Sequence, residues 1–368
     1  MSSAFPVPRK FLFMEALERE PAIKYILGLN EIVSAAMAEG YARASGRPGF
    51  LNLHTGPGLA ASLPMLYNAH AGGVPLVITV GQQHTRLLQY DPHLSGDILG
   101  MGKLYTKWCT EITHAEDLQV TIQRAFKMAM QPPTGPVLIS IPQNVLAQEI
   151  EFQYRPNTFV FPRLRPDRDA VDGALDILLK AQKPLILVES GVSRSDALEQ
   201  AVRFAELIGA RVYQQWMSDV NFPVDHPQYL GDLDPTSPPA KKLLGEADVL
   251  IGIGCPMFAM AFYNPEFAIP EGVRFVHIDE NPWEIGKNFP VDCGIQADIK
   301  TTLEELNRAL ERQMPPEGKS DVQRRVKEIK EEKALEKVID RQKKIIAEQA
   351  MDISILKEVK KHLQKKGL

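Results

Sequence analysis

The sequence predicts an α/β protein with two doubly wound parallel-sheet domains followed by a helical C-terminal tail. Three observations predict this class. Short runs rich in Ile, Val and Leu alternate with stretches of helical periodicity in the first 142 residues, and the same alternation returns after a proline-containing stretch at residues 152–167. The final stretch, residues 319–368, is dense in Lys, Arg and Glu. Alternating strands and helices are typical of parallel βα units.

Length and composition limit the possible functions. A chain of 368 residues is long for one core, since domains average ~150 residues. The formal net charge of -4 gives no electrostatic reason to expect nucleic acid as a partner. Cys109, Cys255 and Cys293 are widely separated, so they predict a reducing cytoplasm rather than a disulfide framework or a zinc site. No signal peptide and no apolar run near ~20 residues is recognisable, so we expect no membrane span.

The first predicted domain covers residues 1–155. Its apolar runs are expected to form strands that are buried on both faces. The predicted strands are Lys24–Leu29, Gly49–His54, Pro75–Gly81 and Pro136–Pro142. The predicted helices between them are Ile32–Ser45, Leu59–Ala71 and Ala115–Met130.

The second predicted domain covers residues 166–312. Pro156, Pro162 and Pro166 interrupt any regular period before it, which is typical of a domain boundary. The predicted strands of this domain are Pro184–Glu189, Arg211–Gln215, Asp248–Gly254 and Arg274–Asp279. Helices are expected at about Asp167–Ala181 and Asp196–Ile208.

The tail, residues 319–368, has apolar residues at a spacing that gives a helix with one narrow apolar stripe. We expect a second helix to begin near Asp352 or Ser354 and to end at Gly367. Two amphipathic helices bury little on their own. A solvated linker helix is therefore favoured over a coiled coil.

The first segment suited to chemistry is Gly28–Ile32, which ends an apolar run and opens a helix. Asn30 is a good N-cap residue. Glu31 then falls in the first helical turn, where the positive end of the helix dipole favours a carboxylate. The alternative is that Glu31 only complements this dipole.

The second segment is the glycine-rich turn Asn52–Gly58, which links a strand to a helix. Turns of this kind let backbone N–H groups face a ligand. The turn matches neither GxGxxG nor GxxxxGK[ST], so it predicts neither a dinucleotide site nor a P-loop. His54 follows the strand, where open α/β sheets place ligands. A purely structural histidine is the competing interpretation.

The third segment is Gly81–Arg86, where Gln82 and Gln83 follow another apolar strand. Such side chains can orient a polar substrate, or they can hold a surface turn by hydrogen bonds. The later turn Gly252–Pro256 lacks the third glycine of a nucleotide loop. A nicotinamide-dependent oxidoreductase is therefore disfavoured.

Four segments in register carry a family resemblance over Leu17–Leu310. They read LGLNEIVSAAMAEGYARASGRPG, NLHTGPGLAASLPMLYNA, PLVITVGQQHTR and TGPVLISIPQNV. In this order they resemble the thiamine-diphosphate-dependent enzymes that include acetolactate synthase and benzoylformate decarboxylase. The resemblance implies that the first domain is an N-terminally shortened pyrimidine-binding domain and that the second is the central domain.

The same resemblance implies roles for individual residues. Glu31 is expected to bond N1′ of the cofactor's aminopyrimidine ring, and His54 to relay protons to the reacting 2-oxo acid. Gly56, Pro57 and Gln82 are expected to contact the cofactor, while Thr55, Gln82 and Gln83 join His54 on the substrate side. No residue of the chain is expected to bind a metal ion.

The family's GDG…N signature, which holds Mg²⁺ and the cofactor diphosphate, does not occur in the sequence. We therefore expect these ligands to come from a missing domain or a partner chain, with residues 319–368 as the linker leading to that domain. The chain alone is expected to bind thiamine diphosphate weakly and to be inactive. A homo-oligomer or a separate diphosphate-binding subunit would complete the site. FAD is not indicated.

The expected function is that of a thiamine-diphosphate-dependent 2-oxo acid decarboxylase or carboligase component. The alternative is a non-catalytic binding or regulatory homologue that retains the fold and the dimer interface. Benzoylformate decarboxylases carry a histidine after the GxP turn of the central domain, and the resemblance places Ala261 at that position here. Which 2-oxo acid serves as substrate is therefore left open.

Overall fold

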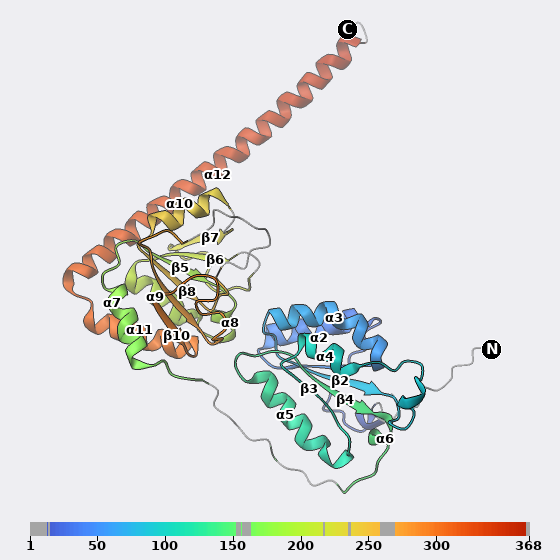
Figure 1. The fold of residues 1–368 in the computed structure, drawn as a ribbon. Coiled ribbons are helices and arrows are strands. Elements are labelled where there is room, and N and C mark those ends of the chain that lie inside the picture. Colours follow the sequence, from blue (N-terminus) through green and yellow to red (C-terminus); the bar gives the residue numbers. More distant parts are fainter. Residues whose placement is uncertain are drawn as a thin grey trace. The chain divides into compact units, whose positions relative to one another are not determined.

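A computed structural model describes residues 13, 15–151, 156, 163–215, 218–234, 237–257 and 269–365. Ala261 lies outside these residues. The chain divides into two units, residues 1–162 and residues 163–368. Each unit is built around a parallel sheet covered by helices (Figure 1), so the predicted α/β class is confirmed.

The first unit contains a four-stranded parallel sheet in the order β1-β2-β4-β3. Its two inner strands, β2 and β4, consist almost entirely of buried residues, as the apolar runs predicted. The short edge strand β3 was not predicted, because its four residues are half-buried and include a Thr and a Glu. The strands are β1 (Gly49–Leu53), β2 (Leu76–Gln82), β3 (Trp108–Glu111) and β4 (Val137–Pro142).

Helices cover both faces of this sheet (Figure 1). On one face, α2 (Glu31–Ser45) and α3 (Thr55–Ala71) pack against each other, and α4 (Ile98–Tyr105) packs beside α3. The opposite face is covered by α5 (Leu118–Met130), while the one-turn helix α6 (Gln143–Leu146) follows β4. Two short 3₁₀ turns, η1 (Leu88–Tyr90) and η2 (Ala115–Asp117), lie in the connections.

The predicted strand Lys24–Leu29 is wrong. Residues 24–28 have no regular secondary structure, and the side chain of Leu29 is 98% exposed. An apolar run becomes a strand only when a neighbouring strand takes up its backbone hydrogen bonds. Within the described residues, no strand pairs with this run, so its apolar side chains stay at the surface.

The second unit contains a six-stranded parallel sheet in the order β10-β9-β8-β5-β6-β7. The four inner strands correspond to the four predicted ones. The edge strands β7 and β10 were missed because edge strands need not be continuously apolar. The strands are β5 (Pro184–Val188), β6 (Arg211–Gln215), β7 (Tyr229–Leu233), β8 (Val249–Ile253), β9 (Arg274–Asp279) and β10 (Cys293–Gln296).

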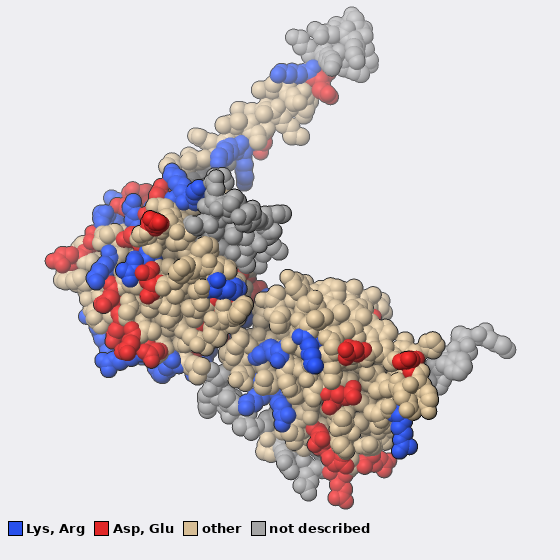
Figure 2. Space-filling model, in the orientation of Figure 1, with Lys and Arg blue, Asp and Glu red and all other residues tan. Residues whose placement is uncertain are grey.

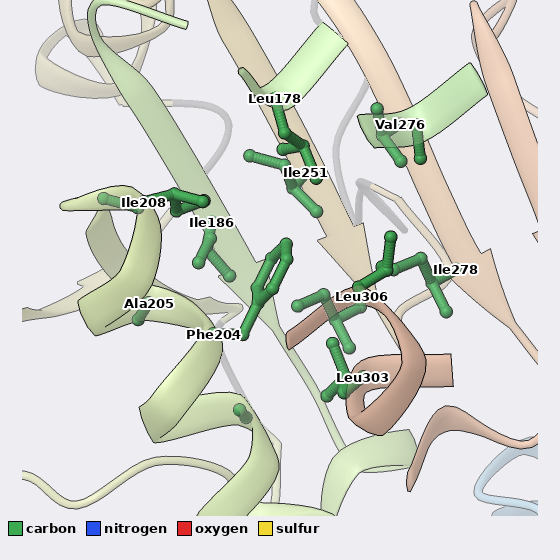
Figure 3. Close-up of a cluster of buried hydrophobic side chains, with 14 of the residues drawn as sticks. Leu178, Ile186, Phe204, Ala205, Ile208, Ile251, Val276, Ile278, Leu303 and Leu306 are labelled. Carbon is green, nitrogen blue, oxygen red and sulfur yellow. The ribbon is translucent and has the colours of Figure 1, made fainter. Parts of the chain in front are cut away.

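The main core of this unit lies between the sheet and three helices on one face (Figure 3). Phe204 of α9 and Leu303 and Leu306 of α11 meet Ile186 and Ile251 from the strands, all with negligible exposure. A smaller cluster on the other face includes residues of α10. The helices are α7 (Arg168–Leu178), α8 (Gly191–Arg194), α9 (Leu198–Ile208), α10 (Pro238–Glu246) and α11 (Ile299–Gln313).

The C-terminal region forms one helix, α12 (Pro316–Lys365), rather than the two that were predicted. No Gly or Pro occurs between Lys319 and Lys365, so nothing in this stretch ends a helix. Asp352 and Ser354 are therefore interior helix residues. Within the part of the chain that the structure describes, no helix has both the length and the apolar character needed to cross a membrane.

The first third of α12 is anchored on the second unit by a buried arginine. The Arg325 guanidinium donates hydrogen bonds to the carbonyl oxygens of Ala181 (3.1 Å) and Ile208 (2.9 Å). These carbonyls lie at the C-terminal ends of the α7 and α9 regions, where helix carbonyls lack partners within the helix. Ile329 is buried one turn further along.

Replacing Arg325 with Ala leaves these two carbonyl oxygens without their donor. We expect the second unit to lose about 2 kcal/mol of unfolding free energy, since an unsatisfied buried polar group costs about 1–3 kcal/mol. Urea unfolding followed by circular dichroism measures this loss. The matched control is Arg324→Ala, which removes an exposed side chain and should leave the midpoint nearly unchanged. Equal midpoints for both variants would contradict the anchoring role.

Candidate functional site

The start of α2 fixes the position of Glu31. Asn30 has extended backbone angles, and its side-chain oxygen accepts a hydrogen bond from the Ile32 amide at 2.8 Å. This is the N-cap that the sequence predicted. Glu31 is half-buried in the first turn of the helix, close to the positive end of its dipole.

The carboxylate of Glu31 lies against the first turn of α3. A Cβ atom at Gly58 would be 3.5 Å from Oε1 of Glu31 and 3.8 Å from Cβ of His54. Ser62, one turn later, donates a hydrogen bond to the Gly58 carbonyl oxygen at 2.9 Å. Glu31 and His54 therefore border the same glycine, although 23 residues separate them in the sequence.

The turn between β1 and α3 directs His54. The following residue, Thr55, has a φ of 54°, which is rare for a β-branched residue and marks a strained turn. Thr55 is fully buried, and its hydroxyl oxygen has no hydrogen-bond partner within the described residues. His54 is half-buried at the N-cap position of α3. The strained turn holds His54 at the carboxyl end of β1.

Gln82 and Gln83 attach a loop to the end of β2. The Gln82 side chain donates to the Gly96 carbonyl oxygen at 3.2 Å and accepts from the Gln83 amide at 2.8 Å. The Gln83 side chain donates to the His93 carbonyl oxygen. Both glutamines are buried, at 5% and 1% exposure. Their amide groups hold the loop that contains His93 and Gly96 beside the Gly56 turn.

Gly56 explains why this loop can approach so closely. Its amide donates to the Leu94 carbonyl oxygen at 3.4 Å, and a Cβ there would be 3.1 Å from the Ser95 carbonyl oxygen. A larger residue would push the loop away. Pro57, the next residue, is exposed.

A small cavity of about 40 Å³ lies at the carboxyl ends of β1, β2 and β4. His54 and Gln82 line it, so the structure brings these two predicted residues together. Asn52 and Thr79 also line it and are bonded to each other at 2.9 Å between Nδ2 and Oγ1. The remaining lining residues are Phe13, Leu53, Val80, Gly81, Ile141, Gln143 and Leu146.

Asn52 and Thr79 were not predicted as site residues. The available sequence signal was a polar residue inside each of two otherwise apolar strands. Their pairing depends on the parallel register that places Asn52 opposite Thr79. Of the predicted residues, Glu31, Thr55, Gly56, Pro57 and Gln83 do not line the cavity.

Two models of one family match the chain. The N-terminal TPP binding domain of thiamine pyrophosphate enzymes matches residues 3–106, and the central domain of the same enzymes matches residues 171–306. Together they cover more than half of the chain. The chain belongs to the thiamine pyrophosphate enzyme family.

Individual family members support this assignment. The acetolactate synthase large subunit of Haemophilus influenzae is 29% identical over 298 residues, which are 79% of this chain and 52% of that protein. The probable acetolactate synthase large subunit of Methanocaldococcus jannaschii is 32% identical over 299 residues, which are 78% of this chain and 49% of that protein. The chain spans about half the length of these curated relatives.

Solved structures show the same fold. Benzoylformate decarboxylase from Polynucleobacter necessarius superposes with a TM-score of 0.76 at 28% identity, over 82% of this chain and 57% of that one. A putative thiamin diphosphate-dependent enzyme from Mycobacterium smegmatis gives a TM-score of 0.73 at 31% identity, over 78% of this chain and 55% of that one. The predicted resemblance is confirmed.

The residues of the first unit fit one half of the family's cofactor. Glu31 offers a carboxylate acceptor beside a glycine with no side chain, which suits a flat ring that carries an N–H donor. The diphosphate half needs oxygen ligands arranged around a hard cation. The described parts of the chain contain no group of three His, Cys, Asp or Glu side chains that would hold such an ion.

The second unit, which matches the family's central domain, carries a second set of titratable groups at the carboxyl ends of its strands. Burial raises the pKa of Glu189, which directly follows β5, to about 7, with Asp279 adding to the effect and Arg194 opposing it. Burial also raises the pKa of Asp279, at the end of β9, to about 6. Glu280 has its pKa raised to about 7 by burial and by its hydrogen bond with Asp298.

Glu189→Gln should change how stability depends on pH. An unfolded chain releases the Glu189 proton near its ordinary pKa of 4.5, whereas the folded chain keeps it until about pH 7. Between these values the folded state binds more protons, so the unfolding free energy falls as pH rises and then levels off. Between pH 5 and pH 8 the unfolding free energy of the variant should therefore fall by roughly 1–3 kcal/mol less than that of the unchanged protein.

Urea unfolding at pH 5, 6, 7 and 8 measures this difference. Glu199→Gln is the matched control, since Glu199 is exposed on α9. An unchanged pH profile in Glu189→Gln would show that Glu189 ionises normally in the folded protein.

Proposed function

We propose that this chain is a component of a thiamine-diphosphate-dependent 2-oxo acid decarboxylase or carboligase, and that its first unit supplies the pyrimidine side of the active site. The observation that carries the proposal is the Glu31 carboxylate held against Gly58, with His54 bordering the same glycine. The acetolactate synthase and benzoylformate decarboxylase relatives support the substrate class, a 2-oxo acid.

Glu31 is the proposed cofactor contact. Its carboxylate would accept a hydrogen bond from N1′ of the aminopyrimidine ring and hold a proton there. A bond to an ionised acceptor is roughly twice as strong as a neutral one, and partial burial strengthens it further. The Asn30 cap and the first turn of α3 keep the carboxylate in place before the cofactor arrives, so little ordering cost remains on binding.

His54 is the proposed proton carrier on the substrate side. An imidazole can hold or release a proton near neutral pH, which suits a reaction that changes the charge on the substrate's oxygen. When bound, thiamine diphosphate supplies the electron sink for the electron pair left behind as carbon dioxide departs. The half-buried position of His54 beside Gly58 and the cavity would keep bulk water from this proton.

The remaining predicted residues are proposed to position this pair. Thr55 fixes the strained turn that aims His54, and Gln82 and Gln83 hold the neighbouring loop by their side-chain amides. Gly56 and Pro57 would contact the cofactor through the start of α3. Gln82 also borders the cavity, where it would face both cofactor and substrate.

Mg²⁺ and the diphosphate are proposed to be bound by residues outside this sequence. A diphosphate-binding domain on a second subunit, or on further chain, would supply oxygen ligands for the ion. The complete site would then form in an oligomer or with a partner chain. A cytoplasmic location fits the three unpaired cysteines.

Glu31→Gln should weaken thiamine diphosphate binding at least about tenfold, because hydrogen bonds to charged groups contribute about 1.5–3 kcal/mol. The measurement is an NMR titration of the ¹⁵N-labelled chain with thiamine diphosphate and Mg²⁺ at millimolar concentrations. Shifts are expected at the amides of Gly56 and Gly58. Weak binding is anticipated even for the unchanged protein.

Glu116→Gln serves as the control, since Glu116 is an exposed residue of the same unit outside the cavity. It should bind as the unchanged protein does. If Glu31→Gln binds equally well, or if no amide near Gly58 shifts, the site assignment fails and a non-catalytic homologue becomes the better account.

A further inference from the structure

The distal part of α12 extends beyond the globular part of the second unit (Figure 1). Lys333 donates hydrogen bonds to the carbonyl oxygens of Val224 (3.3 Å) and His226 (2.6 Å). Glu332 forms an ion pair with Arg211 at 2.9 Å. Every side chain from residue 341 to residue 358 is exposed. The helix therefore leaves its own unit just after Lys333.

This exposed stretch is not uniformly polar. Figure 2 shows extended uncharged surface along it, with charged side chains at intervals. The apolar side chains on it are 40–68% exposed. They are Leu335, Val338, Ile339, Ile345, Ile346, Met351, Ile353, Ile355 and Leu356.

Most of these residues follow a seven-residue repeat. Ile339, Ile346 and Ile353 are seven residues apart and occupy one core position of a heptad, position a. Position d, three residues after each isoleucine, holds Gln342, Gln349 and Leu356, and Leu335 occupies position d of the preceding heptad. Val338 and Ile345 flank the seam at position g. Because α12 is one continuous helix, the repeat runs unbroken over about 33 Å, from residue 335 to residue 356.

A strict seven-residue repeat selects the kind of partner. In a straight helix of 3.6 residues per turn, such a stripe drifts around the surface by ~20° per heptad. Over the three heptads of residues 335–356 the drift adds up to about 60°, and a second helix of the same repeat can follow it by supercoiling.

The polar residues of the seam favour a second copy of the same helix. In a parallel, in-register pair, Gln342 faces its own counterpart, and each amide can donate to and accept from the other. Gln349 pairs in the same way. An unrelated apolar helix would bury both amides without partners, which is costly. Asp352 at position g would also lie near Lys357 at position e of the other copy, with opposite charge.

We propose that residues 335–356 of α12 form a parallel, in-register, two-stranded coiled coil with the same segment of a second copy of this chain. The β-branched isoleucines at position a favour two strands in a parallel arrangement. The contact is isologous, so each residue of the seam meets its own counterpart across a two-fold axis. This inference does not depend on the proposed enzymatic function.

Sedimentation equilibrium of the full chain over a range of concentrations tests the proposal. Ile346→Asp places a charge in the seam and should raise the dimer dissociation constant at least tenfold. Met351→Asp makes the same kind of change on the outer side of the helix and should leave the constant unchanged. Circular dichroism of both variants checks that α12 remains helical.

Disulfide trapping tests the register and separates this contact from any other dimer face. Gln349→Cys should form a disulfide-linked dimer under mild oxidation, because counterparts at position d lie within disulfide reach. Met351→Cys should link no more than the unchanged protein. The proposal is overturned if Gln349→Cys links no better than Met351→Cys, or if Ile346→Asp associates like Met351→Asp. A chain that stays monomeric throughout would also overturn it and assign the stripe to a different partner.

Discussion

The close approach of α2 to α3 at Gly58 is the constraint on which the candidate site depends. Only a glycine leaves open the space between the Glu31 carboxylate and His54, because a side chain there would touch both. The apolar residues that α2 buries in the unit's core are all alanines, Ala35, Ala38 and Ala42, and Glu39 is also buried on this helix. The small side chains of α2 thus help to hold Glu31 against the first turn of α3.

The rest of the first unit gives this arrangement its rigidity. Parallel strands bring the ends of β1 and β2 to one edge of the sheet, so the turn carrying His54 lies beside the two buried glutamines. Each glutamine donates a side-chain N–H group to a carbonyl oxygen of the neighbouring loop. Side chains that are already held in place need little reorganisation when a ligand binds, which is how enzymes stabilise charge at low cost.

Local rules made part of this site predictable. Asn30 as N-cap, Glu31 in the first helical turn and the glycine turn after His54 each follow from residues adjacent in sequence. The Asn52–Thr79 pair was not predictable, because it depends on strand register between residues 27 positions apart. For the same reason residues 24–29, an apolar run like the true strands, were wrongly predicted to pair. Helix continuity through Asp352 was missed because a capping residue also tolerates a helix interior.

Thiamine diphosphate binding to Gly58→Ala tests the central claim most directly. The new methyl group would sit 3.5–3.8 Å from its neighbours, so the unit should fold normally while the space beside Glu31 is lost. Overfilled sites typically cost 1–3 kcal/mol, so affinity should fall about tenfold or more in an NMR titration. Gly40→Ala on α2, where a Cβ has open space, should bind like the unchanged protein. Unaltered binding by a folded Gly58→Ala variant would contradict the account.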